Sequence, residues 1–427
     1  MGLGIRSGAI AVLFGIAALA AQSTNVFVPR DHPAIQYSTR PVQDAIVRLN
    51  ERIEKGELKL HFEAPPRGYL AAVLKALDIP ASSQTLVFSE NSLQRAHISK
   101  ATPRAIYFND TVAVGWAKGA DTVEATVFDA TQGVHFYSIP QSAHEKPRFV
   151  ARDGDCLQCH LLPQTHGVPG VLTMSVLPLS DNKNEYAQGW PMDHRTPIED
   201  RWGGWYVTGT QVPAKHIGNV PVLHVPRSYV RAETAPKLAS GSAAFDTAAY
   251  LTPHSDVVAL MVLNHQTHMT NLLIRLGWQA RIAAHREQQK PIVSAGEVRD
   301  TAIELADYML FAEEAPLSSP IAGTSGFAKD FSARGPHDAK GRSLRDFDLM
   351  RRLFRYPCSY MIYTGAFDAL PPVAKAAVYE RLWEVLSGKA SDWNYAKLSR
   401  DDRRAIVEIL RETKTGLPDS FTAARIP

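Results

Sequence analysis

Residues 84–139 alternate between apolar and polar side chains with a period of two, which is typical of half-buried strands. Five segments rich in β-branched and aromatic residues follow this pattern, at 85–88, 105–108, 111–116, 123–128 and 134–139. Turn-forming residues separate them at hairpin spacing, as at Asn109 and Asp110. The pattern predicts an antiparallel sheet in the N-terminal half of the chain.

Helical periodicity appears on both sides of this predicted sheet. Residues 41–56 begin with proline and end with glycine, as helices do, and residues 69–77 predict a second short helix. The longest helical pattern is 256–286, with an apolar stripe formed by Val257, Leu260, Met261, His265, Met269 and Leu272. We therefore expect an α+β fold, in which an antiparallel β-rich part leads into an irregular segment and then a mainly α-helical C-terminal part.

The tail of the chain carries further helix signals. Pro371 and Pro372 start a predicted helix that Gly388 ends, and Ser399 with Asp402 resembles a capping box. Residues 314–343 are rich in Gly, Ser, Pro and Ala and predict a long loop or linker. The predicted organisation is thus a helix pair with a β-rich domain at 22–150, an irregular segment with the long helix at 151–313, the linker, and a helical region at 344–427.

The first 21 residues have the pattern of a removable export signal. Arg6 precedes an uncharged apolar run at 8–21 that closes on the small residues Ala18 and Ala20. This run is too short to span a bilayer comfortably, so we expect cleavage and no stable membrane span afterwards. The expected location is the bacterial periplasm or the medium.

The one strong chemical motif is Cys156-Leu157-Gln158-Cys159-His160, a Cys-x-x-Cys-His sequence typical of c-type haem attachment. Two thiols at this spacing can each form a thioether to one porphyrin, and the following histidine supplies an axial ligand to iron. The composition of the chain would produce the motif by chance with a probability of roughly 0.0005. The sequence therefore predicts one covalent haem c, with Cys156 and Cys159 as anchors and His160 as proximal iron ligand.

Two other interpretations of the cysteine pair stay open at the sequence level. A zinc site needs two more ligands, and the nearest histidine is His166, with no second Cys pair or His pair at finger-like spacing. A thioredoxin-like dithiol starts a helix after a buried parallel strand, whereas residues 147–154 predict only a short strand and a turn. The third cysteine, Cys358, is typical of a buried small apolar residue.

A second axial ligand decides whether the haem only transfers electrons or also binds small molecules. His265 is the first candidate because it lies on the apolar stripe of the long helix, where a buried imidazole needs a partner. His216 and His194 follow, since both lie near glycine or proline in the irregular segment. Weaker candidates are Met174, Cys358, His268 and His166.

Arg195, Arg201 and Trp202 are the candidates for binding the haem propionates. A guanidinium matches the geometry of a carboxylate, and an indole N–H can donate to one. The alternative for the arginines is a surface ion pair, and for Trp202 a place in the core. Two of the three belong to the glycine- and tryptophan-rich segment 201–209.

The overall composition excludes few functions. With 45% hydrophobic and 21% charged residues and a net charge of +3, the chain has no basic patch of the kind that nucleic-acid binding requires. The arginine cluster at 342–355 predicts a solvated face, or a docking surface for an acidic redox partner. We expect a redox partner protein and no nucleic acid.

At the Cys156–His160 motif the chain resembles the c-type cytochromes. It departs from their small monohaem type because its motif follows a β-rich part. Segments 201–209, 355–360 and 107–110 are also similar to a recurring group of secreted bacterial haem proteins, which implies export and haem binding. The leading hypothesis is an exported monohaem protein that transfers single electrons. The alternatives are a haem c oxidoreductase, peroxidase-like or acting on a small sulfur or nitrogen compound, and a haem-based sensor.

Overall fold

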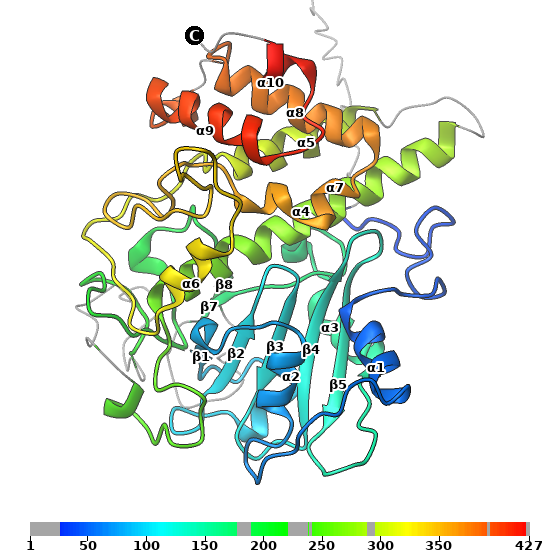
Figure 1. Cartoon of the computed structure of the whole chain (residues 1–427), viewed down its shortest axis with the longest axis vertical. Helices are drawn as coiled ribbons and strands as arrows, with labels where there is room; N and C mark the ends of the chain where they lie inside the picture. Colours follow the sequence, from blue (N-terminus) through cyan, green and yellow to red (C-terminus); the bar gives the residue numbers. More distant parts are fainter. Residues whose placement is uncertain are drawn as a thin grey trace, which may run out of the picture.

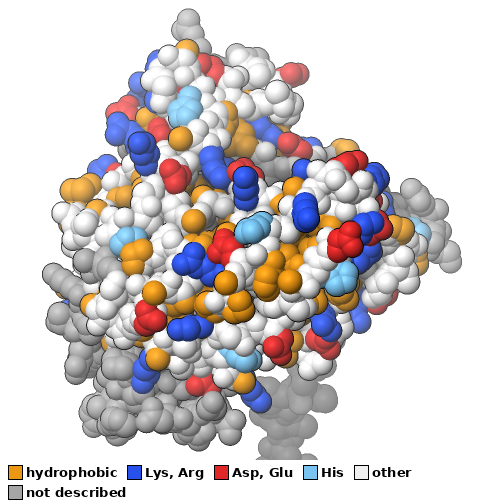
Figure 2. All heavy atoms as spheres, turned by 60° about the horizontal axis from the view of Figure 1, so that its bottom comes forward, with side chains coloured by type: hydrophobic (Ala, Val, Ile, Leu, Met, Phe, Trp, Pro, Cys, Tyr) orange, Lys and Arg blue, Asp and Glu red, His pale blue; other side chains and the backbone are white. Residues whose placement is uncertain are grey.

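The computed structural model describes residues 26–176, 189–220, 238, 241–287, 295–390 and 393–423. The predicted export signal at 1–21 therefore lies outside the described residues. Within the described part, no helix combines the length and the apolar character that crossing a bilayer would require. Figure 2 shows one face of the molecule, on which hydrophobic side chains gather in a band with acidic and basic side chains around it.

An antiparallel sheet of seven strands forms the N-terminal half, in the order β6-β5-β4-β3-β2-β1-β9. Its central strands are β1 (Thr85–Val87), β2 (Arg104–Phe108), β3 (Val112–Trp116), β4 (Thr122–Asp129) and β5 (Gly133–Pro140). Two short edge strands complete it, β6 (Val150–Ala151) and β9 (Trp205–Tyr206). The period-two pattern placed the five central strands to within one or two residues. In β2, β3 and β4 one face is buried and the other is partly open, whereas β1 and β5 are buried on both faces.

The buried face of the sheet packs on two helices, α1 (Ala45–Glu54) and α2 (Leu70–Ala76) (Figure 1). Their apolar side chains form one cluster with those of the sheet, including Leu49, Val73, Val114 and Val123. Helix α1 begins after Asp44, whose carboxylate accepts hydrogen bonds from the amides of Ile46 and Val47, rather than at the proline of residue 41.

The other face of the sheet lies against α4 (Val257–Glu287), the long helix that connects both halves of the molecule (Figure 1). Residues on nearly all sides of α4 are buried, so it behaves as a central core helix rather than an amphipathic surface helix. Its apolar residues share a cluster with Phe108 of β2 and with the C-terminal helices.

The C-terminal part is helical, as predicted. It comprises α5 (Ala295–Met309), α6 (Phe327–Ala333), α7 (Gly365–Asp368), α8 (Pro372–Leu386), α9 (Arg400–Thr413) and α10 (Asp419–Ala423). The capping box at Ser399 and Asp402 is present at the start of α9. The segment 314–343, expected as a loop, contains α6, whose Phe327 and Phe331 are part of the main core. The α+β class is confirmed.

Candidate haem site

The Cys-x-x-Cys-His motif forms the second half of a short helix, α3 (Asp153–His160), which follows strand β6. Asp153, at its first residue, fixes this helix to strand β5. One carboxylate oxygen of Asp153 accepts a hydrogen bond from the amide of Phe136 at 2.8 Å, and the other lies 2.9 Å from Nδ1 of His135. Since His135 and Phe136 belong to the sheet, the motif is placed at the sheet edge with a defined orientation.

Within the motif the two thiols have different surroundings. Cys156 is half-buried and packs against an apolar cluster that contains Phe136 and Trp278, while Cys159 is exposed. Burial, with additional repulsion from Glu124 and Asp153, raises the pKa of the Cys156 thiol to about 12. A reactive dithiol needs a lowered thiol pKa, so these surroundings disfavour the redox-dithiol interpretation.

The ring of His160 has one nitrogen fixed and the other left for a ligand. Its Nδ1 donates to the backbone carbonyl of Gly170 at 2.9 Å, and the amide of Gly170 donates back to the carbonyl of His160. Burial lowers the pKa of His160, which favours the neutral imidazole. Histidines that bind metals through Nε2 commonly donate their Nδ1–H to a backbone carbonyl in this way.

Asn271, in the middle of α4, holds the loop that orients His160. Its side chain makes two hydrogen bonds with the backbone of Val171, one accepted from the amide at 2.9 Å and one donated to the carbonyl at 2.8 Å. At the neighbouring Gly170, a Cβ atom would lie 2.3 Å from Oδ1 of Asn271, so this position requires glycine. The long helix therefore positions the predicted iron ligand through Asn271.

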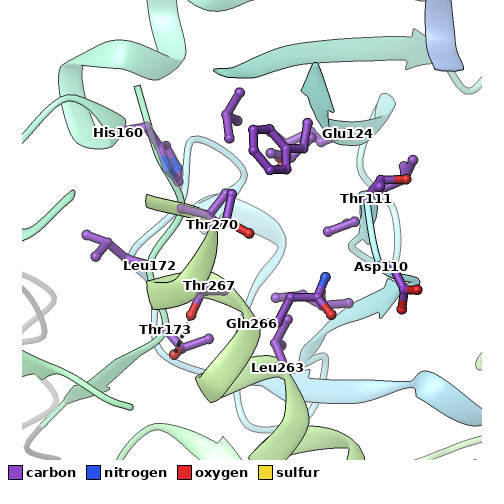
Figure 3. Close-up of a pocket in the computed structure, with 18 of the residues that line it drawn as sticks. Asp110, Thr111, Glu124, His160, Leu172, Thr173, Leu263, Gln266, Thr267 and Thr270 are labelled. Carbon is purple, nitrogen blue, oxygen red and sulfur yellow. Dashed lines mark hydrogen bonds between the residues drawn. The ribbon is translucent and has the colours of Figure 1, made fainter. Parts of the chain in front are cut away.

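His160 lies in the wall of an open pocket of about 140 Å³. This volume is below the roughly 300–1,000 Å³ of pockets that enclose a whole ligand, so a cofactor bound here would extend through the open side of the pocket. Figure 3 shows His160 on one side of the pocket, Asp110 and Thr111 on the opposite side, and four residues of α4 along a third side. Those four are Leu263, Gln266, Thr267 and Thr270.

The floor of the pocket is the open face of the sheet, and its central side chains are small. Ala113 of β3 pairs with Thr126 of β4, and Gly115 lies beside Glu124 in the same two strands. Side chains at these positions point to one face because they alternate along each strand. The small residues leave a recess between the sheet and α4.

Arg104 is the cationic side chain of this pocket. Its guanidinium forms an ion pair with Glu124 and crosses Gly115, where a Cβ atom would come within 2.2 Å of Nη2. Its Nε is buried and has no hydrogen-bond partner among the described residues. An unpartnered buried donor of this kind suits a carboxylate ligand, and a haem propionate is one such group.

The predicted propionate ligands lie elsewhere and have partners within the protein. Arg195 pairs with Asp193 at 2.6 Å. Arg201 is buried and donates to the carbonyls of Thr196 and His194, and the indole of Trp202 donates to Asn264 at 3.1 Å. None of the three lines the pocket. Arg104, which the sequence did not single out, lines the pocket.

The three histidines predicted as second axial ligands are also outside the pocket lining. His265 is fully buried, as its place on the apolar stripe indicated, but Nδ1 lies 2.9 Å from Nδ1 of His194, and Nε2 lies 2.8 Å from the hydroxyl of Ser359. His216 packs beside Trp202, with its Nδ1 accepting from the amide of Gly218. The geometry thus brings His265 and His194 together with each other and not with His160.

Comparison with protein-family models, with curated proteins and with solved structures gives no match. The chemistry of the site therefore has to be argued from its own residues.

Two buried and two half-buried histidines predict a loss of stability in acid. Burial lowers the pKa of His166 and His216 to about 4, and that of His265 and His268 to about 3. The unfolded chain takes up these protons below pH 6.5, whereas the folded chain resists them until its own lower pKa values. The free energy of unfolding therefore has its full value above pH 6.5 and falls as the pH drops toward 4. Each histidine lowers it by up to about 1.4 kcal/mol per pH unit.

Urea unfolding at pH 7.5, 6.5, 5.5 and 4.5 measures this dependence. The variant His216→Gln serves as the matched control, because it removes one of the contributing histidines and should therefore reduce the slope. An unfolding free energy that stays constant from pH 7.5 to 4.5 would contradict the assignment of these rings as neutral and buried.

Proposed function

We propose that this chain is an exported monohaem c-type redox protein, with thioether bonds to Cys156 and Cys159 and with His160 as axial ligand. The observation that carries the proposal is the orientation of His160. On the helix that bears both cysteines, its Nδ1 is fixed to the carbonyl of Gly170, and its other nitrogen remains for the pocket. Export belongs to the proposal because bacteria attach this haem outside the cytoplasm.

Bound haem supplies an iron centre that exchanges single electrons or accepts a small ligand. The chain's own residues would bind and orient it. Asn271 holds the loop beside His160, and the small side chains of β3 and β4 leave room for the ring. The guanidinium of Arg104 would bind a propionate and would lose part of its ion pair with Glu124.

The lining of the pocket favours chemistry or sensing on a small molecule over simple electron transfer. Among the described residues that line it, His160 is the only imidazole, and no thiol or thioether accompanies it. The polar groups across the pocket are the carboxylate of Asp110, which also pairs with Arg345, and the hydroxyls of threonines, which can form hydrogen bonds with a small polar substrate. Electron transfer to a partner protein is the second candidate, supported by the exposure of Cys159 at the protein surface.

Carbon monoxide added to the reduced protein separates these two functions. If the pocket leaves the iron open to a ligand, the Soret band of the reduced protein should shift on addition of CO. We expect the same response from His265→Ala, since both nitrogens of His265 are bonded to other side chains, and a changed spectrum before CO from His160→Ala. A reduced haem that ignores CO, and that becomes reactive in His265→Ala, would contradict the proposal for the pocket and support a second histidine ligand.

A further inference from the structure

A second group of metal-ligating side chains lies beside the haem pocket. His166, His268 and Glu304 each offer one ligand atom, and these atoms all lie within 4.8 Å of one another. They come from three separate segments, namely the loop after α3, the middle of α4 and the middle of α5. We propose that these three residues form a site for one divalent transition-metal ion of the zinc class, independent of the haem.

The two imidazoles are well prepared to bind a metal ion. Their rings are 4.7 Å apart and nearly perpendicular, at 82°, so that nitrogens from both can approach one point. The backbone of His166 has a φ of 57° and its carbonyl accepts a hydrogen bond from Arg275 at 2.6 Å. A non-glycine residue held in this conformation is uncommon, and such residues cluster at functional sites.

Asp193 provides the support that metal-binding histidines usually have. One of its carboxylate oxygens lies 3.5 Å from Nδ1 of His268, longer than a hydrogen bond but on the side from which a carboxylate can orient a metal-bound imidazole. Burial lowers the pKa of both histidines, so that the rings are neutral at pH 7 with a lone pair each for a metal ion.

In the structure the guanidinium of Arg195 lies next to His268. Nη2 of Arg195 is 3.1 Å from Nε2 of His268, while the same guanidinium is held by two hydrogen bonds to Asp193. A metal ion at Nε2 would replace the contact with Nη2, and Arg195 would keep its Nε bond to Asp193. The carboxylates of Asp193 and Glu304 face this group, together with the guanidiniums of Arg195 and Arg275. The exposed side chain of Glu304 gives the ion access from solvent.

The donor set selects for the kind of ion. Two imidazoles and one carboxylate are the ligands of many zinc sites and of non-haem iron sites. Calcium and magnesium instead require six or more oxygen ligands, of which this site has one or two. We therefore expect zinc to bind, and calcium and magnesium not to compete with it.

The test uses the full-length haem protein, treated with a chelator and then dialysed against micromolar zinc chloride. Elemental analysis by mass spectrometry should find one zinc per chain, and the absorbance of the haem separately reports the haem iron. The variants His166→Gln, His268→Gln and Glu304→Gln should each lose the stoichiometric zinc without a change in iron. Asp193→Asn should weaken zinc binding about 10–100-fold.

His216→Gln is the matched control, because His216 is also buried but lies outside the group, and this variant should keep its zinc. Glu304→Gln changes an exposed residue, so it remains informative should a buried histidine variant fail to fold. The proposal is overturned by wild-type protein that retains no zinc, or by Glu304→Gln protein that binds zinc as tightly as the wild type.

Discussion

The double variant Cys156→Ala/Cys159→Ala should contain no covalently bound haem. In the wild type, denaturation and extraction with acidified organic solvent should leave the colour on the polypeptide, because thioether bonds survive this treatment. In the double variant the pocket and His160 are intact, but both attachment points are gone. The intact mass of the extracted protein should then equal that of the processed chain alone. This is an all-or-none effect, and intact-protein mass spectrometry measures it directly.

The third cysteine supplies a control. Cys358 is fully buried in the main core, far along the chain from the motif, and burial raises the pKa of its thiol to about 12. Cys358→Ala should retain the haem and lose about 1 kcal/mol of stability as a small cavity forms in the core. The haem proposal would be refuted if the extracted wild-type chain were colourless and had the mass of the bare polypeptide. A metal-binding cysteine pair would then be the favoured interpretation.

Local patterns determine much of this fold, which is why the sequence predicted the strands and several helix ends correctly. The alternation in β4 reflects a sheet with one buried face, and the capping box at Ser399 and Asp402 involves residues three positions apart. Helices α5 and α6 were missed. In α6, Phe327 and Phe331 point into the core from a segment rich in glycine and serine, so tertiary packing outweighs weak local propensity.

The haem motif could be read from five residues, whereas the rest of the site could not. Arg104, Gly170 and Asn271 reach the pocket or orient His160 through contacts between segments distant in the chain. His265 illustrates the limit of pattern reasoning. Its place on the apolar stripe correctly predicts burial, but the partners that satisfy its two nitrogens are His194 and Ser359, each more than seventy positions away. A buried histidine needs a partner, and the sequence alone does not say which one.

Replacing Asp256 with alanine should destabilise the whole molecule. Asp256 is buried and lies directly before α4, the helix that carries Asn271. Its Oδ1 accepts hydrogen bonds from the amides of Val258 and Ala259, at the first turn of the helix. Its Oδ2 accepts from the amides of Thr324 and Ser325, and from the Ser325 hydroxyl, in the segment before α6. One carboxylate therefore caps the central helix and ties a distant loop to it.

The expected loss in unfolding free energy for Asp256→Ala is about 4 kcal/mol, since a helix cap contributes about 1 kcal/mol and each buried donor left without a partner costs about 1–3 kcal/mol. Urea unfolding followed by circular dichroism measures it. Asp256→Asn keeps one acceptor oxygen and should fall between alanine and wild type. Ser399→Ala removes the exposed cap of α9 and should cost only about 1 kcal/mol. If Asp256→Ala lost no more than Ser399→Ala, the loop before α6 would not depend on this carboxylate. Asn271 would then be positioned by the packing of α4 alone.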